Sequence, residues 1–232
     1  MSLQQSLAIG APEVVLAAGA LVLLMIGVFR GNDSLTGLSW GAAILFGLTA
    51  LTVVDDAPVR VLAWNDLYVA DSLSAFLKVL ILVGAAASVL MAVPYLERVK
   101  AHRFEYPVLI VLATLGMFVM VSANNLMALY MGLELMSLSA YVLAAFHRDE
   151  ERSTEAGLKY FVLGALSSGV MLYGMSLVYG FVGSTEFTAI GAGLSAGEER
   201  NLGALFGLVF VLAGLAFKVS AVPFHMWTPD VY

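Results

Sequence analysis

The chain has 232 residues, of which 61% are hydrophobic and 12% are charged, and its mean hydropathy is +0.93. A water-soluble domain is about 45–50% apolar and about 25% charged, so this composition excludes an ordinary soluble enzyme. Disorder is excluded as well, because disordered chains are poor in apolar residues. The composition therefore predicts an integral membrane protein.

Several kinds of site lose support from composition alone. The sequence contains no cysteine, which excludes disulfides, thiolate zinc sites and iron–sulfur clusters held by cysteines of this chain. The three histidines are far apart and form no short metal-ligand motif. The formal net charge is -6 and no basic patch is present, so nucleic-acid binding has no support.

Seven apolar stretches follow one another along the chain, and each is long enough to cross about 30 Å of hydrocarbon as a helix. They cover residues 12–29, 38–54, 72–95, 106–123, 124–146, 153–182 and 202–222. Only helices can span here, because the alternating pattern of membrane strands is missing. The sequence predicts an all-α membrane protein with about seven transmembrane helices.

Lysines and arginines between these stretches predict the orientation. The loops after the first, third and fifth stretches carry six of them, whereas the opposite loops carry two, Arg60 and Arg200. Basic loops stay in the cytoplasm, so the N-terminus is expected outside it, in the periplasm. The first apolar run has no preceding basic residue, so we expect a retained helix instead of a cleaved signal peptide.

Glu134 is the deepest ionisable residue of the fifth stretch, and it lies too far from either end to reach water. Tyr130, Glu134, Ser137 and Tyr141 are spaced by four, three and four residues, which places them on one helix face. An ionisable group at this depth is a functional hypothesis by default. The alternative is a permanently protonated glutamate that only packs.

Lys218 lies in the seventh stretch, five residues before Pro223, which disfavours continuation of the helix. The following residues, including His225, are too polar for lipid, and a broken helix at membrane depth is tolerated inside protein or along a water-filled cavity. A desolvated lysine beside such a break can exchange protons. The alternative is a helix that simply ends, with Lys218 reaching to the interface.

Two further lysines lie near helix ends. Lys159 is about six residues inside the sixth stretch, where it could reach the interface, relay protons or pair with Glu134. Lys78 follows Asp71 by seven residues, which favours reaching to the interface or a local ion pair. These stretches contain a carboxylate, lysines and a histidine, without metal ligands or a nucleophile. Such a set suits proton transfer better than reactions that make or break covalent bonds.

Three long motifs carry a resemblance to a known family. They are MGLELMSLSAY at residues 131–141, EAGLKYFVLGALSSG at residues 155–169 and FKVSAVPFHMWTPDVY at residues 217–232. They resemble the antiporter-like proton-channel subunits of bacterial respiratory NADH:quinone oxidoreductase, complex I. That family carries inverted five-helix repeats with a broken seventh helix. The chain is expected to match roughly the N-terminal half of a member.

The resemblance implies roles for particular residues. Glu134, Lys159, Lys218 and His225 are carried over as proton-transfer residues. No cofactor or metal is expected on this chain, since NADH, FMN, iron–sulfur clusters and quinone belong to other subunits of the complex. The implied partners are other membrane-arm subunits, lipid and protons, in the bacterial inner membrane.

The resemblance also implies a division of the chain. Residues 1–105 would form three N-terminal transmembrane helices, and residues 106–232 would form part of the first antiporter-like repeat. The implied function is proton translocation coupled to quinone reduction. A subunit of a multi-subunit cation/proton antiporter and a purely structural scaffold remain as alternatives.

Overall fold

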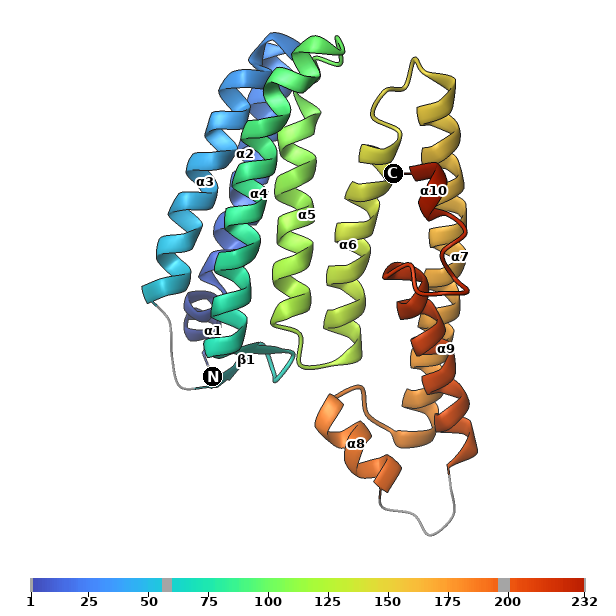
Figure 1. Ribbon diagram of the computed structural model, residues 1–232. Coiled ribbons are helices and arrows are strands. Elements are labelled where there is room, and N and C mark those ends of the chain that lie inside the picture. The colour runs from blue at the N-terminus through green and yellow to red at the C-terminus, as the bar shows by residue number, and fades with distance from the viewer. Residues whose placement is uncertain (1, 56–59, 196–200, 232) are drawn as a thin grey trace. The chain divides into compact units, whose positions relative to one another are not determined.

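The computed structural model describes residues 2–55, 60–195 and 201–231, which are predominantly helical (Figure 1). The chain forms two compact units. Unit 1 comprises Met1–Ala123 and Met131–Leu143, and unit 2 comprises Asn124–Tyr130 and Ala144–Tyr232. The division expected at residue 105 concerns structural repeats, and it stays a prediction.

Unit 1 is a helical bundle with a small β-hairpin at one end (Figure 1). Its elements are α1 (Leu3–Ile9), α2 (Ala11–Arg30), the short 3-10 helix η1 (Asn32–Ser34), α3 (Leu35–Asp55), β1 (Val61–Ala63), β2 (Tyr68–Ala70), α4 (Ser72–Arg98), α5 (Glu105–Val121) and most of α6 (Leu126–Ala144).

Unit 2 consists of the start of α6 and four further helices. These are α7 (Glu151–Val182), α8 (Phe187–Ser195), α9 (Leu202–Lys218) and α10 (Thr228–Val231). The helices α7 and α9 share the most extensive contact in this unit.

The membrane-spanning helices match the expected stretches closely. Among the described residues, five helical segments are long and apolar enough to cross a membrane, and α5 and α9 add two apolar helices of 17 residues. Seventeen residues is about the shortest length that spans the hydrocarbon. The all-α membrane fold is therefore confirmed.

Local sequence signals fix the ends of α4. Asp71 and Ser74 form a reciprocal capping box, in which the Asp71 carboxylate accepts from the Ser74 amide at 2.8 Å. At the other end, Lys100 takes a left-handed conformation with φ 54°. Hydrogen bonds from Ala101 N to Leu96 O and from Lys100 N to Glu97 O complete a Schellman motif, which stops the helix before the basic loop.

The β-hairpin is an element that the sequence pattern did not predict. Its strands pair antiparallel, with Val61 opposite Ala70 and Ala63 opposite Tyr68. The residues of the turn, Trp64 to Asp66, all have positive φ. The amide of Val69 donates to Ser122 O at 2.8 Å, so β2 is also bound to the end of α5.

The core of unit 1 lies between α2, α3, α4 and α5. Its fully buried side chains include Leu16, Phe46, Val89, Val111 and Phe118. At the end opposite the hairpin, the Phe104 ring packs against Gly27, so the loops after α2 and α4 lie together. The basic residues Arg30, Arg98, Lys100 and Arg103 therefore share one end of this unit, as the expected alternation of loops requires.

Glycines set the approach of α7 and α9 in unit 2. A Cβ at Gly174 would lie 2.6 Å from Gly207 O, so the two backbones are in direct contact. The sequence contains three pairs of small residues four positions apart, a spacing that favours close helix packing. They are Gly203 with Gly207, Gly164 with Ser168, and Ala165 with Gly169. The first pair packs as this spacing indicates, whereas Ala165 and Gly169 are exposed within the unit.

Candidate functional site

Glu134 lies near the middle of α6. It is eight residues from Leu126 and ten from Ala144, which corresponds to roughly 12–15 Å along the helix axis. Its side chain is half-buried, while Ser137 and Tyr141 on the same face are buried. The expected polar face is thus directed largely into protein, within a helix long enough to span a membrane.

The backbone around Glu134 is held by a close crossing of α5 and α6. A Cβ at Gly116 would lie 2.5 Å from Met136 N, and one at Gly132 would lie 2.7 Å from Met120 N. Any larger residue at either position would force the helices apart. Two glycines therefore fix the segment that carries the carboxylate, since Gly132 and Met136 flank Glu134 in sequence.

Lys218 is the last residue of α9, and the expectation that this helix continues to residue 222 is wrong. The helix ends in a Schellman motif centred on Ser220, which has φ 56°. Ala221 N donates to Ala216 O at 2.8 Å and Ser220 N donates to Phe217 O at 3.0 Å. The break thus begins four residues before Pro223, and the half-buried Lys218 lies directly at it.

The segment after the break packs back onto unit 2. The buried Trp227 stacks on Tyr160 of α7, with ring centroids 4.3 Å apart and planes 8° apart. Its indole Nε1 donates to Phe217 O at 3.2 Å, which satisfies one carbonyl near the end of α9. His225 lies in this segment and its side chain is exposed within the unit.

Lys159 pairs with two carboxylates of unit 2. Its Nζ lies 2.8 Å from Glu155 Oε1, one helical turn earlier, and 3.1 Å from Asp230 Oδ2 on α10. The lysine side chain is 43% exposed, so it reaches the surface of the unit. Asp230 is a partner that the sequence analysis missed, because 71 residues separate it from Lys159.

The four expected proton-transfer residues divide between the units. Glu134 belongs to unit 1, whereas Lys159, Lys218 and His225 belong to unit 2. Within unit 2, the Asp230–Lys159 contact and the Trp227–Tyr160 stack tie the segment that carries His225 to α7. Lys218 and His225 thus lie on either side of Pro223 at the break after α9, and Lys159 contacts α10, the helix that follows the break.

A further charged group, Lys78, is buried in unit 1 with a carboxylate partner. Its Nζ lies 2.6 Å from Glu13 Oε1, and only 4% of the lysine side chain is exposed. The expectation of a local ion pair near Asp71 is wrong, because the carboxylate in direct contact is Glu13 on α2, far away in sequence. The sequence analysis missed both Glu13 and Tyr68, whose hydroxyl lies 2.7 Å from Lys78 Nζ.

The fold and the position of these groups define an antiporter-like, multi-pass helical membrane protein. The family model described as "NADH:quinone oxidoreductase/Mrp antiporter, TM" matches residues 123–232. Among solved structures, a chain of respiratory complex I from Thermus thermophilus is 30% identical, with a TM-score of 0.77 over 95% of this chain and 47% of that chain. An archaeal membrane-bound sulfane sulfur reductase also gives a TM-score of 0.77, at 22% identity, which shows the fold alone.

Curated relatives are more similar still. NADH-quinone oxidoreductase subunit N of Parvibaculum lavamentivorans is 58% identical over 95% of this chain and 46% of the relative. Subunit N 1 of Rhizobium meliloti is 56% identical over 98% of this chain and 47% of the relative. The chain spans about half the length of the curated relatives it matches. The resemblance to the antiporter-like family, and within it to subunit N, is confirmed.

Proposed function

We propose that this chain belongs to a proton-translocating membrane-arm subunit of an NADH:quinone oxidoreductase, in which quinone reduction drives proton pumping. The observation that carries the proposal is the similarity of nearly the whole chain to proteins named NADH-quinone oxidoreductase subunit N. The position of Glu134 in the middle of a membrane-length helix supports it. Burying a carboxylate in a membrane costs free energy, so such a residue is a candidate for a functional role.

The proposal gives each candidate residue a part in proton transfer. Glu134 holds a proton within the membrane, and Lys218 exchanges one at the break that follows α9. Lys159 sits between the carboxylates of Glu155 and Asp230, which can hold its ammonium in place. The imidazole of His225 can both accept and donate a proton, which suits transfer of a proton between the break and water.

We also place the redox cofactors on other subunits of the complex and this chain in the membrane. NADH, FMN, iron–sulfur clusters and quinone bind other subunits, and this chain contributes no redox group. Its partners are the other membrane-arm subunits and the lipid bilayer. The protein lies in the bacterial inner membrane with its N-terminus in the periplasm, since the basic loops after α2, α4 and α6 favour the cytoplasm.

Substitution of Lys218 in the assembled complex tests this proposal. Lys218→Arg keeps the positive charge but cannot release a proton, so the initial rate of proton uptake by inverted vesicles given NADH should fall about tenfold or more. The rate of proton uptake should fall equally in Lys218→Ala, and it should fall less in His225→Ala. Lys100→Arg, at an exposed loop lysine, is the matched control. Normal pumping by Lys218→Arg would show that Lys218 does not carry protons.

The second candidate is a subunit of a cation/proton antiporter. The matched family model supports it, because that model describes Mrp antiporters as well as NADH:quinone oxidoreductase. The two functions differ in their driving force. Vesicles that move protons on addition of NADH without added sodium support the first function. Sodium-dependent proton movement in the absence of NADH would support the second.

A further inference from the structure

A buried charged cluster lies at the hairpin end of unit 1, outside the set of four residues discussed above. We call Glu13, Tyr68 and Lys78 the hairpin-end cluster. Lys78 Nζ lies 2.6 Å from Glu13 Oε1 and donates to the Tyr68 hydroxyl at 2.7 Å. The Tyr68 hydroxyl in turn donates to the Glu13 carboxylate at 3.0 Å. The phenol therefore accepts from one member of the ion pair and donates to the other.

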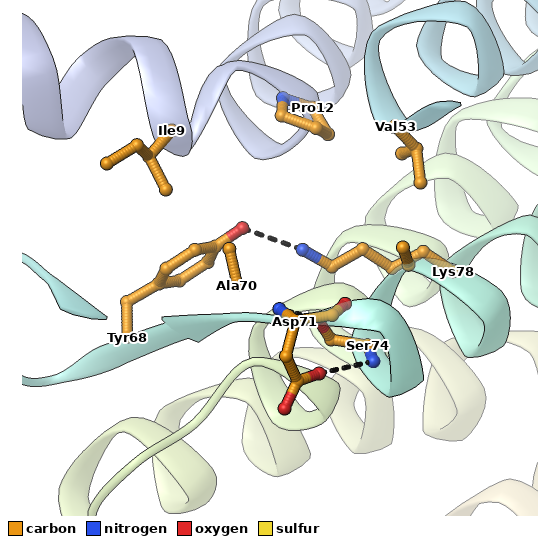
Figure 2. Close-up of a pocket in the computed structure, with 9 residues that line it drawn as sticks. Ile9, Pro12, Val53, Tyr68, Ala70, Asp71, Ser74 and Lys78 are labelled. Atoms are coloured by element: carbon orange, nitrogen blue, oxygen red, sulfur yellow. Dashed lines mark hydrogen bonds between the residues drawn. The ribbon is translucent and has the colours of Figure 1, made fainter. Parts of the chain in front are cut away.

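The three groups come from three separate segments. Glu13 lies in the first turn of α2, Tyr68 on β2 and Lys78 in the second turn of α4. Figure 2 shows the Tyr68 hydroxyl directed at the Lys78 ammonium. The hairpin holds Tyr68 in place, because β2 is hydrogen-bonded to β1 on one side and to the end of α5 on the other.

Aromatic and apolar side chains, with one further carboxylate, surround the cluster. The rings of Tyr68 and Phe118 lie 4.8 and 5.4 Å from Lys78 Nζ, and Phe118 belongs to α5. From α3, the apolar Val53 faces the same space. The other charged group near Lys78 is Asp71, whose carboxylate caps α4 through the Ser74 amide. Glu13 is thus the carboxylate in direct contact with the lysine.

Stability alone gives little reason to bury this pair. Removal of two charges from water costs about as much as their attraction returns, and apolar side chains of the same volume are often as stable. The retained charges therefore require an explanation other than packing.

A small cavity borders the cluster. Its volume of about 20 Å³ is sufficient for one water molecule. Tyr68 and Lys78 line it together with Asp71 and Ser74, as Figure 2 shows. The cavity therefore borders Lys78 and Tyr68, and both of these groups contact the Glu13 carboxylate directly.

We propose that the hairpin-end cluster is a second proton-exchange site of the subunit, in which Glu13 stores one proton that enters through Lys78. The lysine ammonium gives a proton to the Tyr68 oxygen while the Tyr68 hydroxyl proton passes to Glu13, or the proton crosses the direct contact. The resulting neutral amine takes a proton from hydronium in the cavity. The net change is one proton moved from water to the Glu13 carboxyl, and release is the reverse.

This inference rests on the proposed function, because a stored proton has a use only where protons cross the membrane. The test must distinguish proton exchange from a purely structural role of the ion pair. Glu13→Gln alone leaves Lys78 buried without its counter-charge, so it damages folding under either account. The double variant Glu13→Gln/Lys78→Met removes both charges and keeps both volumes, so it should fold and assemble.

The decisive experiment compares the double variant with wild type in the assembled complex. If the cluster exchanges protons, assembly is normal but the initial rate of proton uptake by inverted vesicles given NADH falls about tenfold. The infrared band of the protonated carboxyl, in spectra recorded at two pH values, is lost as well. Normal pumping by the double variant, or retention of that band, overturns the inference.

Two further sets of variants complete the test. Glu97→Gln/His102→Gln, at an exposed pair 3.9 Å apart, is the matched control and should pump normally. Glu134→Gln and Lys218→Arg are measured in parallel. If these two lose pumping while the double variant does not, only the present inference fails. If they too pump normally, the proposed function fails.

Discussion

Lys78 in unit 1 and Lys159 in unit 2 both contact carboxylates, yet their surroundings are opposite. The Lys78–Glu13 pair is 4% and 13% exposed, whereas Lys159 and its two carboxylate partners are between 43% and 59% exposed. Unit 1 thus ties α2, β2 and α4 together through a buried charge. Unit 2 joins α7 and α9 through glycine backbones and has its Lys159 ion pairs at the surface of the unit.

The difference shows that the presence of a lysine in an apolar helix does not by itself predict whether its side chain is buried or exposed. Both lysines lie near the start of a membrane-length helix, and both have an acidic residue close by in sequence. What separates them is the carboxylate that tertiary structure supplies. Glu13 reaches Lys78 inside the bundle, while Asp230 reaches Lys159 at the surface of its unit. The buried pair should therefore be the more sensitive to substitution.

The largest effect is expected from removal of the buried counter-charge. Glu13→Ala leaves the buried Lys78 ammonium without its counter-charge, which should lower the free energy of unfolding by about 3–5 kcal/mol. The measurement is SDS-induced unfolding of the detergent-solubilised protein. Glu155→Ala, at the exposed pair of unit 2, serves as the comparison and should have much the smaller effect. Equal losses in the two variants would remove the contrast between the units.

The next effect concerns the backbone contact of unit 2. A methyl group at Gly174 would lie 2.6 Å from Gly207 O, so Gly174→Ala must separate α7 from α9 and should cost about 1–3 kcal/mol. Gly169→Ala on the same helix is the matched control, because nothing lies within 4 Å of its Cβ. The control should be neutral or slightly stabilising. Both are measured by the same unfolding titration, and equal behaviour would refute the role of glycine here.

The smallest effect is expected at the exposed pair. Lys159→Met removes contacts to Glu155 and Asp230 that solvent and salt already screen, so stability should change little. Any loss should disappear in high salt. A large, salt-independent loss in the unfolding titration would show that Lys159 is as critical to folding as Lys78.

Sequence reasoning succeeded where the signal is local. The apolar stretches gave the spanning helices, because each crossing needs a continuous run of apolar residues. The spacing around Glu134 placed it correctly on α6 with Ser137 and Tyr141. The depth of the carboxylate could be counted along the helix, since the rise per residue is fixed.

Sequence reasoning failed where contacts between distant segments, or the conformation of turns, determine the structure. Glu13 and Tyr68 are 55 residues apart, so nothing in the local pattern indicated that they meet at Lys78. The hairpin was missed because its strands have three residues each, too few for a recognisable period. The end of α9 was misplaced because Ser220, a residue without strong preference for positive φ, forms the terminating motif ahead of Pro223.

We propose that this chain moves protons through Glu134. The most direct measurement is the number of protons taken up per NADH oxidised by inverted vesicles that contain the assembled complex with Glu134→Gln. Glutamine keeps the shape and hydrogen bonding of the side chain but cannot titrate. We expect normal assembly with a clearly reduced ratio, and partial recovery with Glu134→Asp. A Glu134→Gln complex that pumps at the wild-type rate and ratio would contradict the claim and make Glu134 a packing residue.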